Sequence, residues 1–157
     1  MDLRGTKLVL VGGAGLIGSH TVDHLIKEDV KEILIYDNMQ RGSAENLYSA
    51  IRDPRVKIYD VGGDVLQADI LQSAFEGADG VFHLAALWLL QCHDYPRSAF
   101  DVNIRGTFNV MEACVAQGVK RLVSSSSASV YGDAVTDPMD EDHPYNNKNF
   151  YGATKIA

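Results

Sequence analysis

The sequence predicts an α/β protein built on a doubly wound parallel sheet, and three features of the 157-residue chain predict it. Short runs of strand length are apolar at consecutive positions, as in strands buried on both faces. Segments with apolar residues at helical spacing separate these runs. A glycine-rich turn joins the first run to the first helical segment. Strands that alternate with helices imply βαβ units with right-handed crossovers.

The strands are located by these apolar runs and by the residues that end them. The first run, Lys7 to Val11, stops at a pair of glycines, and the second, Glu32 to Tyr36, stops at Asp37. Both runs are rich in valine, isoleucine and leucine, which suits a buried strand. Three further strands are predicted at 56–59, 80–84 and 119–124.

The helices fill the intervals between the strands. Helical spacing predicts them at about 17–26, 44–51, 65–75 and 96–117. Ser43 is suited to cap the second helix, and Gly77 and Gly118 are suited to end the third and the fourth. Pro96 stands in the first turn of the fourth helix, where its missing N–H is tolerated. The acidic, proline-containing segment Asp133 to Asn149 is predicted to be a loop.

Composition narrows the class of protein. A net charge of −7 disfavours a broad nucleic-acid surface, which requires a basic face. The longest apolar run, Val81 to Leu90, is too short to span a bilayer, and the first residues lack the layout of a secretory signal. We therefore expect a cytoplasmic protein without nucleic-acid or membrane partners. Cys92 and Cys114 have no metal-binding or redox spacing and are predicted to be buried free thiols.

The turn after the first strand carries Gly12, Gly15 and Gly18 between a strand and a helix. This pattern is typical of Rossmann-type dinucleotide sites. One glycine makes the turn, one lets the backbone approach a pyrophosphate, and one lets the helix pack on the sheet. Amides at the helix start then face the phosphates. Asp37 ends the next strand 19 residues after Gly18, which is the expected place for a ribose-binding carboxylate.

Asp37 favours NAD over NADP as the cofactor. A carboxylate accepts hydrogen bonds from ribose hydroxyls and repels a 2′-phosphate. Arg41 is the counter-evidence, because a guanidinium four residues on could bind that phosphate. Asp64, after the third strand, is expected at the same edge of the sheet, either near the adenine or as a plain turn residue.

Four further motifs follow the glycine turn: His83-Leu-Ala-Ala86, Asn103-Ile-Arg-Gly-Thr-Phe-Asn-Val110, Ser125-Ser-Ser-Ala-Ser-Val-Tyr-Gly132 and Tyr151-x-x-x-Lys155. With them, essentially the whole chain resembles the extended short-chain dehydrogenase/reductase family. Its NAD-dependent sugar-nucleotide epimerase/dehydratase group is the most similar, above all the branch that epimerises UDP-glucose at C4. Two positions depart from the family pattern. Val11 replaces a common threonine and Leu16 a common aromatic residue, and neither change removes a phosphate-binding amide.

The resemblance implies three catalytic residues, Ser127, Tyr151 and Lys155. Tyr151 and Lys155 are four residues apart, so both project from one helix face. Tyr151 is expected to take the proton of the sugar C4 hydroxyl while hydride passes to tightly bound NAD. The ketone then turns over and hydride returns to its opposite face. Ser127 is expected to bond the reacting oxygen, and Lys155 also to hold the nicotinamide ribose.

The resemblance also implies the residues that contact NAD. Asn103 is either one of them or a helix residue with a local partner. His83 reads as a packed strand-end residue, and His20 and His24 lack a third ligand, so no metal site is predicted. The set implied for the cofactor is Gly12, Gly15, Leu16, Ile17, Gly18, Asp37, Asn38, Asp64, Val65, Leu84, Ala85, Ala86, Asn103, Ser125, Tyr151 and Lys155.

Other functions of this family stay open as alternatives. They are another NAD-dependent oxidoreductase, a decarboxylase or a dehydratase acting on nucleotide sugars, and a non-catalytic dinucleotide-binding module. Family dehydratases carry acidic residues after the catalytic hydroxyl, where this chain has Ala128 and Ser129. The apolar segment 87–94 either lines a substrate pocket or packs. The implied partners are a UDP- or dTDP-linked sugar and, in the full-length protein, a second copy that pairs through the 96–117 helix and the helix that starts at 151–157.

Residues 1–157 are expected to form one NAD-binding domain. The chain stops at 151–157 within what reads as the first turns of a helix, with no capping signal. We therefore expect an N-terminal fragment, truncated before the last strands of the sheet and before the substrate domain. Such a fragment is expected to have little or no turnover by itself.

Overall fold

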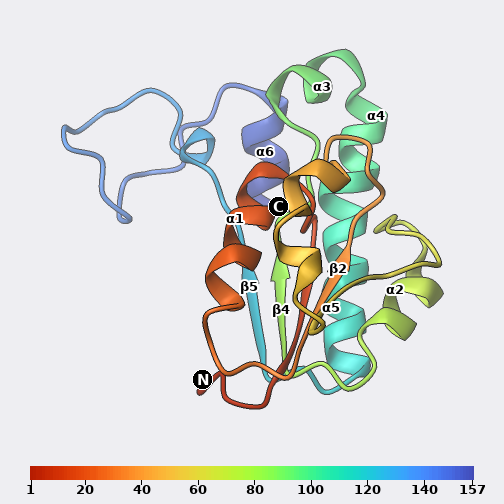
Figure 1. The fold of residues 1–157 in the computed structure, drawn as a ribbon. Helices are drawn as coiled ribbons and strands as arrows, with labels where there is room; N and C mark the ends of the chain where they lie inside the picture. Colours follow the sequence, from red (N-terminus) through yellow and green to blue (C-terminus); the bar gives the residue numbers. More distant parts are fainter. The chain divides into compact units, whose positions relative to one another are not determined.

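A computed structural model describes all 157 residues, which form two compact units. The first unit comprises Met1–Ala85 and Thr107–Ser124, and the second comprises Ala86–Gly106 and Ser125–Ala157. The first unit contains the whole sheet, and the second contains short helices and a long loop (Figure 1).

The first unit is built on a five-stranded parallel sheet. Its strands are β1 (Lys7–Val11), β2 (Glu32–Tyr36), β3 (Val56–Ile58), β4 (Gly80–His83) and β5 (Arg121–Ser124). Their order is β3-β2-β1-β4-β5, and Val11 at the end of β1 pairs with Tyr36 on one side and His83 on the other. The winding therefore reverses between β1 and β4, the switch point at which such sheets bind ligands. The predicted doubly wound fold is confirmed.

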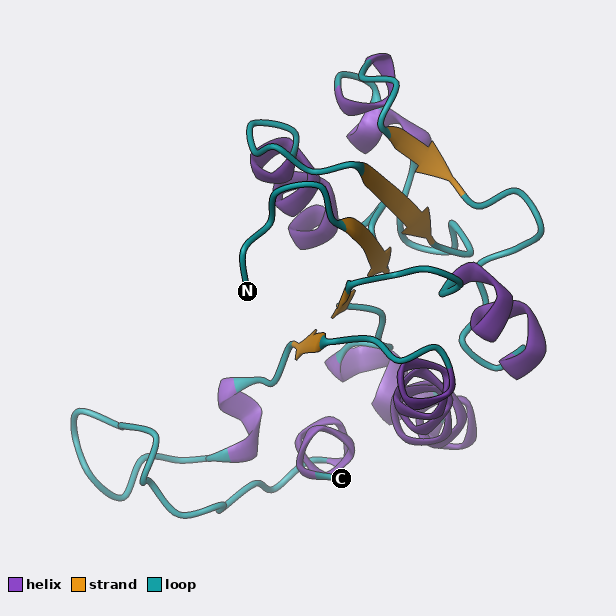
Figure 2. Cartoon of the chain, turned by 90° about the horizontal axis from the view of Figure 1, so that it is seen from below, coloured by secondary structure: helices purple, strands orange, loops and turns teal.

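Helices cover both faces of this sheet (Figure 2). One face carries α1 (Leu16–Leu25) and the 3-10 turns η1 (Ala44–Leu47) and η2 (Ala50–Arg52), and the other carries α2 (Ala68–Ala74) and α5 (Gly106–Ala116). Side chains alternate between the faces of a strand, so Leu8 and Leu10 point to the α1 side. There they form a buried core with residues of α1, β2 and η1, including Val22, Ile33 and Leu47.

Two predicted helices of the first unit have different limits. The segment expected as an α-helix at 44–51 consists of two 3-10 turns. Ser43 caps the first turn by accepting from the Glu45 N–H, as predicted. The helix expected at 65–75 begins only at Ala68. The Asp64 carboxylate accepts from the Leu66 N–H at 2.9 Å, and this local turn competes with helix at that end.

The second unit consists of short helical segments around α6. They are α3 (Leu89–Asp94), α4 (Pro96–Ala99), the π-helical turn η3 (Phe100–Arg105), the 3-10 turn η4 (Ala128–Val130) and α6 (Phe150–Ile156). Helix α6 packs against α3, η3 and η4. The single α-helix predicted at 96–117 is thus interrupted by a π turn, a variation that an apolar pattern with a period of 3.6 residues does not reveal. The loop predicted at 133–149 is confirmed.

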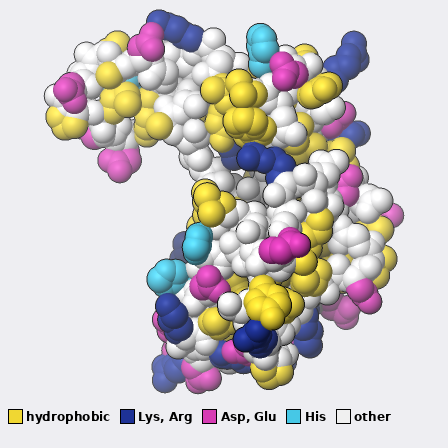
Figure 3. Space-filling model, turned by 45° about the horizontal axis from the view of Figure 1, so that its top comes forward, with side chains coloured by type: hydrophobic (Ala, Val, Ile, Leu, Met, Phe, Trp, Pro, Cys, Tyr) yellow, Lys and Arg dark blue, Asp and Glu magenta, His cyan; other side chains and the backbone are white.

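The helices are too short and too polar to cross a membrane. On the face seen in Figure 3, acidic and basic side chains are interspersed with apolar ones, and neither sign of charge forms one continuous patch. Gly77 and Gly118 adopt positive φ angles of 68° and 65° after α2 and α5, as their predicted roles as helix ends require.

Candidate functional site

The turn after β1 requires glycine at two of its positions. Gly12 has φ of 83°, and a Cβ there would lie 2.6 Å from the Ala85 amide nitrogen. A Cβ on Gly18 would lie 2.6 Å from the Cα of Gly13 and still closer to the Gly12 carbonyl oxygen. The backbone of the turn is therefore packed against both the end of β4 and the start of α1. A larger residue at either position would move the turn.

Helix α1 begins in a way that leaves its first amides open to a ligand. Gly15 is the N-cap and forms no side-chain capping bond, and the first turn has no acidic residue. The first amides of a helix have no partner within the helix and lie at the positive end of its dipole. The Leu16 and Ile17 side chains are 73% and 65% exposed, so neither is packed into the core. The geometry suits an anion such as a pyrophosphate.

Asp37 is tied directly to the glycine turn. Its Oδ2 accepts from the Ala14 N–H at 2.9 Å, and its Oδ1 accepts from the Met39 N–H at 2.9 Å. Each carboxylate oxygen has a further lone pair, which can accept a hydroxyl of a ribose. The sequence predicted the carboxylate at this edge, and the structure adds that the turn itself orients it.

Two glycines in the turns after strands β2 and β3 pack on Asp37. A Cβ on Gly42 would lie 2.9 Å from the Asp37 Oδ2, and a Cβ on Gly63 would collide with the Asp37 carbonyl group. Neither position has room for a side chain beside Asp37. Their positions after strands β2 and β3 were the only signal in the sequence, and it did not show which residue the glycines approach.

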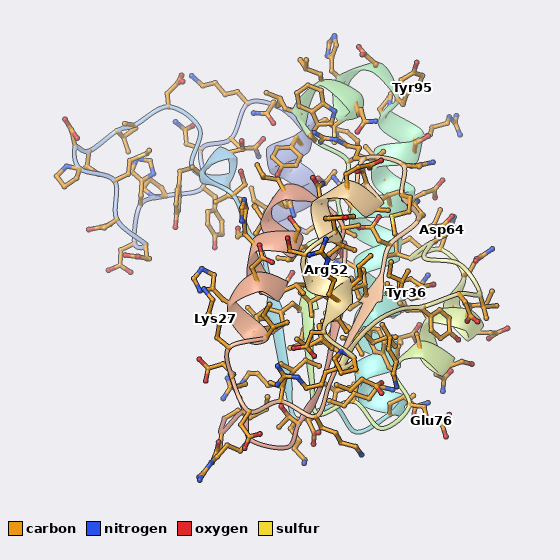
Figure 4. All side chains as sticks on the ribbon, viewed as in Figure 1. Lys27, Tyr36, Arg52, Asp64, Glu76 and Tyr95 are labelled. Atoms are coloured by element: carbon orange, nitrogen blue, oxygen red, sulfur yellow. The ribbon has the colours of Figure 1, made fainter.

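Asp64 and Val65, two further predicted cofactor residues, lie in the loop that follows β3. Tyr36 extends from β2, and its hydroxyl donates to the Asp64 carbonyl oxygen at 2.8 Å (Figure 4). Burial, with Asp64 and Tyr59 nearby, raises the pKa of Tyr36 to about 12, so this donor keeps its proton. The Val65 carbonyl oxygen accepts from the Asn109 amide at 2.9 Å. The loop after β3 is thus held from both sides.

Three other predicted residues have backbone or turn roles here. The Leu84 and Ala85 amides both donate to the Val11 carbonyl oxygen, at 2.8 and 3.0 Å. Asn38 closes a local turn by accepting from the Gln40 N–H at 3.1 Å. These contacts fix the edge of the sheet around β1, and the NAD contacts of these residues stay predictions.

The second unit holds the predicted tyrosine–lysine pair on α6. Asn149 caps this helix by accepting from the Gly152 N–H at 2.7 Å. The Lys155 ammonium donates to the Ser125 carbonyl oxygen at 3.0 Å and lies 6.0 Å from the centroid of the Tyr151 ring. Burial lowers the pKa of Lys155, and the nearby Cys92 thiol opposes that shift. The position of the ammonium is therefore set by its bond to the Ser125 carbonyl oxygen and by the place of Lys155 on α6.

Ser127 lies in the turn that packs on the same helix. It caps η4 by accepting from the Ser129 N–H at 3.2 Å. A Cβ on Gly152, the residue after Tyr151, would lie 2.9 Å from the Asn147 Cβ and would overlap the Ser129 carbonyl oxygen. The serine turn therefore approaches α6 at backbone distance. Sequence reasoning left Gly152 as an unassigned position of the motif.

Asn103 is buried in η3 and has the local partners that were one of its two predicted alternatives. Its Oδ1 accepts from the Leu87 N–H at 2.7 Å, and its Nδ2 donates to the Leu87 carbonyl oxygen and to the Thr154 hydroxyl, both at 3.0 Å. The amide thus holds the segment that follows Ala86. A contact of Asn103 or Ala86 with NAD stays a prediction.

His83 and the two cysteines are packed inside the protein. His83 is buried, and its Nε2 lies 2.8 Å from the Thr107 hydroxyl, as expected for a packed residue. The chain has no group of three residues placed to bind a metal. Cys92 and Cys114 are buried free thiols, as predicted, and burial raises the pKa of Cys114 to about 11.

The segment 87–94 packs in part, and its lining of a substrate pocket stays a prediction. The segment consists of α3 and the two residues before it, and Cys92 within α3 is fully buried. Trp88, Leu89 and Leu90 remain 43%, 44% and 54% exposed. One side of the segment therefore packs, and the other presents apolar side chains to solvent.

Comparison with known proteins assigns the family. The model of the NAD dependent epimerase/dehydratase family matches residues 8–157. The chain belongs to this family. The UDP-glucose 4-epimerase of Bacillus subtilis (strain 168) is 36% identical over 154 residues, which cover 95% of this chain and 44% of that protein. The chain therefore spans about half the length of the curated relatives it matches.

Solved structures of this family share the fold. A UDP-N-acetylglucosamine 4-epimerase from Methanobrevibacter ruminantium M1 superimposes with a TM-score of 0.87 at 32% identity, over 98% of this chain and 48% of that one. The dTDP-glucose 4,6-dehydratase DesIV from Streptomyces venezuelae, solved with NAD bound, has a TM-score of 0.88 at 29% identity, over 96% and 48% of the two chains. The family predicted from the motifs is confirmed.

Proposed function

We propose that this chain supplies the NAD-binding and proton-transfer residues of a 4-epimerase that acts on a nucleotide sugar. The observation that carries the proposal is the placement of Lys155 beside Tyr151, with its ammonium bonded to the Ser125 carbonyl oxygen. A nearby ammonium stabilises a phenolate relative to a phenol. The pair therefore suits proton transfer to and from a sugar hydroxyl.

The first unit fits NAD at its glycine turn. The turn leaves no room for a Cβ at Gly12 or Gly18, and α1 begins without a capping side chain. The first amides of α1 would bind the pyrophosphate. Asp37 would accept from the hydroxyls of the adenosine ribose and repel a 2′-phosphate, which favours NAD over NADP. When bound, NAD accepts a hydride from the sugar and later returns it, so that the cofactor is retained.

Tyr151 performs the proton transfers in this proposal. Its phenolate takes the proton of the sugar C4 hydroxyl as that carbon is oxidised, and returns the proton when the ketone is reduced on its other face. The Ser127 hydroxyl accepts from a backbone amide, which leaves its own proton to donate to the reacting oxygen. Lys155 keeps the phenolate favoured throughout, and by the resemblance also holds the nicotinamide ribose.

The chain is proposed to be the NAD-binding part of a longer enzyme. The matched relatives are about twice as long, and their names specify UDP-glucose, UDP-N-acetylglucosamine or dTDP-glucose. We assign the choice of a UDP- or dTDP-linked sugar to the part of such an enzyme that lies outside these residues. The 157-residue chain is then expected to bind NAD with little turnover.

The decisive experiment incubates the full-length protein with NAD and a panel of UDP- and dTDP-sugars, and identifies products by NMR. A 4-epimer formed without net change in NADH absorbance supports the proposal. A 4-keto-6-deoxy product identifies a dehydratase, net NADH formation identifies a dehydrogenase, and bound NAD without product identifies a binding module. Brisk turnover by the 157-residue chain alone would overturn its assignment as a part.

Variants of the tyrosine–lysine pair test the mechanism in the same assay. Tyr151→Phe and Lys155→Met are each expected to lower kcat by about a hundredfold or more, because each removes a group needed for the proton transfer. Tyr145→Phe is the matched control, since Tyr145 is 70% exposed in the loop before α6. An unchanged kcat in Tyr151→Phe contradicts the role assigned to the phenol.

The apolar face of α5 supports the predicted pairing of two copies. Phe108, Met111 and Val115 follow helical spacing and are 54%, 43% and 83% exposed. A second copy can present the same stripe across a two-fold axis. Sedimentation equilibrium of the full-length protein is expected to show a dimer, and Val115→Lys is expected to give a monomer. A monomeric wild type contradicts this pairing.

A further inference from the structure

Thr154 occupies a position of the Tyr151-x-x-x-Lys155 motif to which the resemblance gives no role. It lies within α6, immediately before Lys155, and is only 3% exposed. Threonine is a weak helix former, and a buried hydroxyl requires hydrogen-bond partners. The presence of this residue in the interior of a short helix therefore calls for a specific set of contacts.

The Thr154 hydroxyl has two partners, one on each side. It donates to the Tyr151 carbonyl oxygen at 2.7 Å and accepts from the Asn103 amide at 3.0 Å. The first bond lies within α6, and the second links α6 to η3. Helix α6 also packs against α3, η3 and η4, and this second bond fixes which side of the helix faces η3.

Asn103 makes this link rigid because its amide is held at both ends. Its Oδ1 and Nδ2 bond the two backbone groups of Leu87, at 2.7 and 3.0 Å. The Nδ2 has two hydrogens, and the Leu87 carbonyl oxygen and the Thr154 hydroxyl both lie 3.0 Å from it. The Cys92 sulfur, at 3.5 Å, is a weaker third partner. The orientation of the Thr154 hydroxyl is therefore determined by the segment before α3.

We propose that Thr154 is a positioning residue, which sets the rotation of α6 so that the Lys155 ammonium reaches the Ser125 carbonyl oxygen beside Tyr151. A hydroxyl that faces η3 leaves the adjacent lysine directed toward the serine turn. Small rotations of a helix displace the end of a long side chain by several times the shift of its Cα. The catalytic consequence rests on the proposed function, whereas the placement of Lys155 does not.

The test compares Thr154→Val and Thr154→Ala, which remove the hydroxyl, with Thr154→Ser, which keeps it. Thr154→Ala also favours helix, so it serves if Thr154→Val does not fold. The first measurement follows the Lys155 side chain of the ¹³C-lysine-labelled chain by NMR as a function of pH. Burial lowers the pKa of Lys155. Loss of the link is expected to release the ammonium to solvent and raise that pKa, while Thr154→Ser leaves it unchanged.

The second measurement is kinetic and uses the full-length enzyme. Removal of the hydroxyl is expected to lower kcat by about tenfold to a hundredfold, with KM changed less than about twofold, because misplacement acts on the chemical step. Thr154→Ser is expected to restore wild-type kcat. Thermal unfolding of each variant shows whether the fold is retained.

The outcomes separate this proposal from the proposed function. An inactive wild type with the expected change at Lys155 refutes the epimerase assignment and leaves the positioning role supported. An active enzyme in which the valine, alanine and serine variants share one kcat and one Lys155 pKa overturns the positioning role alone. Failure of both hydroxyl-free variants to fold, with Thr154→Ser folded, also overturns it, because the hydroxyl is then required for folding itself.

Discussion

Gly18 is the position in the glycine turn where an added Cβ would meet neighbouring backbone atoms most closely. A Cβ there would overlap the Gly12 carbonyl oxygen and lie 2.6 Å from the Gly13 Cα. Gly18→Ala should therefore push α1 away from the turn and misalign its first amides. NAD affinity, measured by titration calorimetry on the chain, is expected to fall at least about tenfold, which corresponds to ~1.4 kcal/mol.

A second glycine provides the control for this substitution. Gly77 has φ of 68°, but a Cβ there meets no atom within 4 Å. Gly77→Ala should cost about 1–2 kcal/mol of unfolding free energy through backbone strain and leave NAD affinity unchanged. If both variants lose NAD affinity to the same extent, the loss reflects general instability and not the geometry of the turn.

The Asp37 carboxylate yields a prediction about cofactor choice. Asp37→Asn keeps an oxygen that can accept from the Ala14 N–H but removes the negative charge that would repel a 2′-phosphate. The affinity for NADP relative to NAD is expected to rise about tenfold or more. Asp69→Asn changes the net charge equally at α2 and should leave the ratio unchanged. An unaltered ratio in Asp37→Asn would show that another group, such as Arg41, determines the choice.

The sequence predicted those site residues whose partners lie nearby in the chain, and missed those whose partners are distant. The turn glycines and the tyrosine–lysine pair form short patterns with known spacing, so they were identified directly. Gly63 and Thr154 instead acquire their roles from Asp37 and Asn103, which stand 26 and 51 residues away. A single sequence contains no signal for such pairings, so these residues were missed.

At the scale of elements, the sequence located every strand and misjudged several helices. Strands β1, β2 and β4 are mostly buried and apolar, and the limits of all five strands were correct within two residues. Helix limits depend instead on local competition, as where the Asp64 carboxylate delays the start of α2. The π turn η3 also follows from its packing, since Asn103 within it bonds Leu87 and Thr154. Periodicity alone does not distinguish these cases.

The loop between η4 and α6 supplies the prediction at this scale. His143 is buried, and its Nε2 accepts from the Val135 N–H at 2.9 Å, while its Nδ1 lies 2.9 Å from the Pro144 carbonyl oxygen. Its ring also meets the Tyr131 ring edge to face, 5.5 Å between centroids. His143→Phe keeps an aromatic ring but removes the acceptor. Val135 is itself 61% exposed, so loss of this part-buried bond is expected to cost only about 0.5–1.5 kcal/mol.

Hydrogen exchange of the Val135 amide measures this effect. Exchange is expected to accelerate in His143→Phe and to return toward the wild-type rate in His143→Gln, whose side-chain oxygen can accept the same bond. His20→Phe, at an exposed position of α1, serves as the unrelated histidine control. Equal exchange at Val135 in all variants would show that the histidine does not hold this loop.

At the scale of the whole molecule, ion-paired carboxylates make stability dependent on pH. The pKa values of Glu32, Asp53, Asp79 and Asp133 are lowered, in each case first by a hydrogen bond from a lysine or an arginine. A carboxyl group whose pKa is lower in the folded chain binds protons less readily than in the unfolded chain. Its contribution to stability is present above the unfolded pKa and disappears as the pH falls through the folded pKa.

Asp53 offers the clearest test because its pKa falls to about 2 beside Arg55. Arg55 also donates to the Ile26 and Glu28 carbonyl oxygens, at 2.6 and 2.8 Å, so the pair ties the end of α1 to the start of β3. The unfolded carboxyl titrates near 3.9, which places the loss of this contribution between about pH 4 and pH 2. Asp53→Asn should therefore be less stable than the wild type at pH 7, and the difference should shrink across that interval.

Urea unfolding at a series of pH values measures both quantities. The control is Asp60→Asn, since Asp60 carries an exposed carboxylate after β3. A constant difference between wild type and Asp53→Asn from pH 7 to pH 2 would mean that the ion pair adds no pH-dependent stability, and that Arg55 acts through its backbone carbonyl bonds alone.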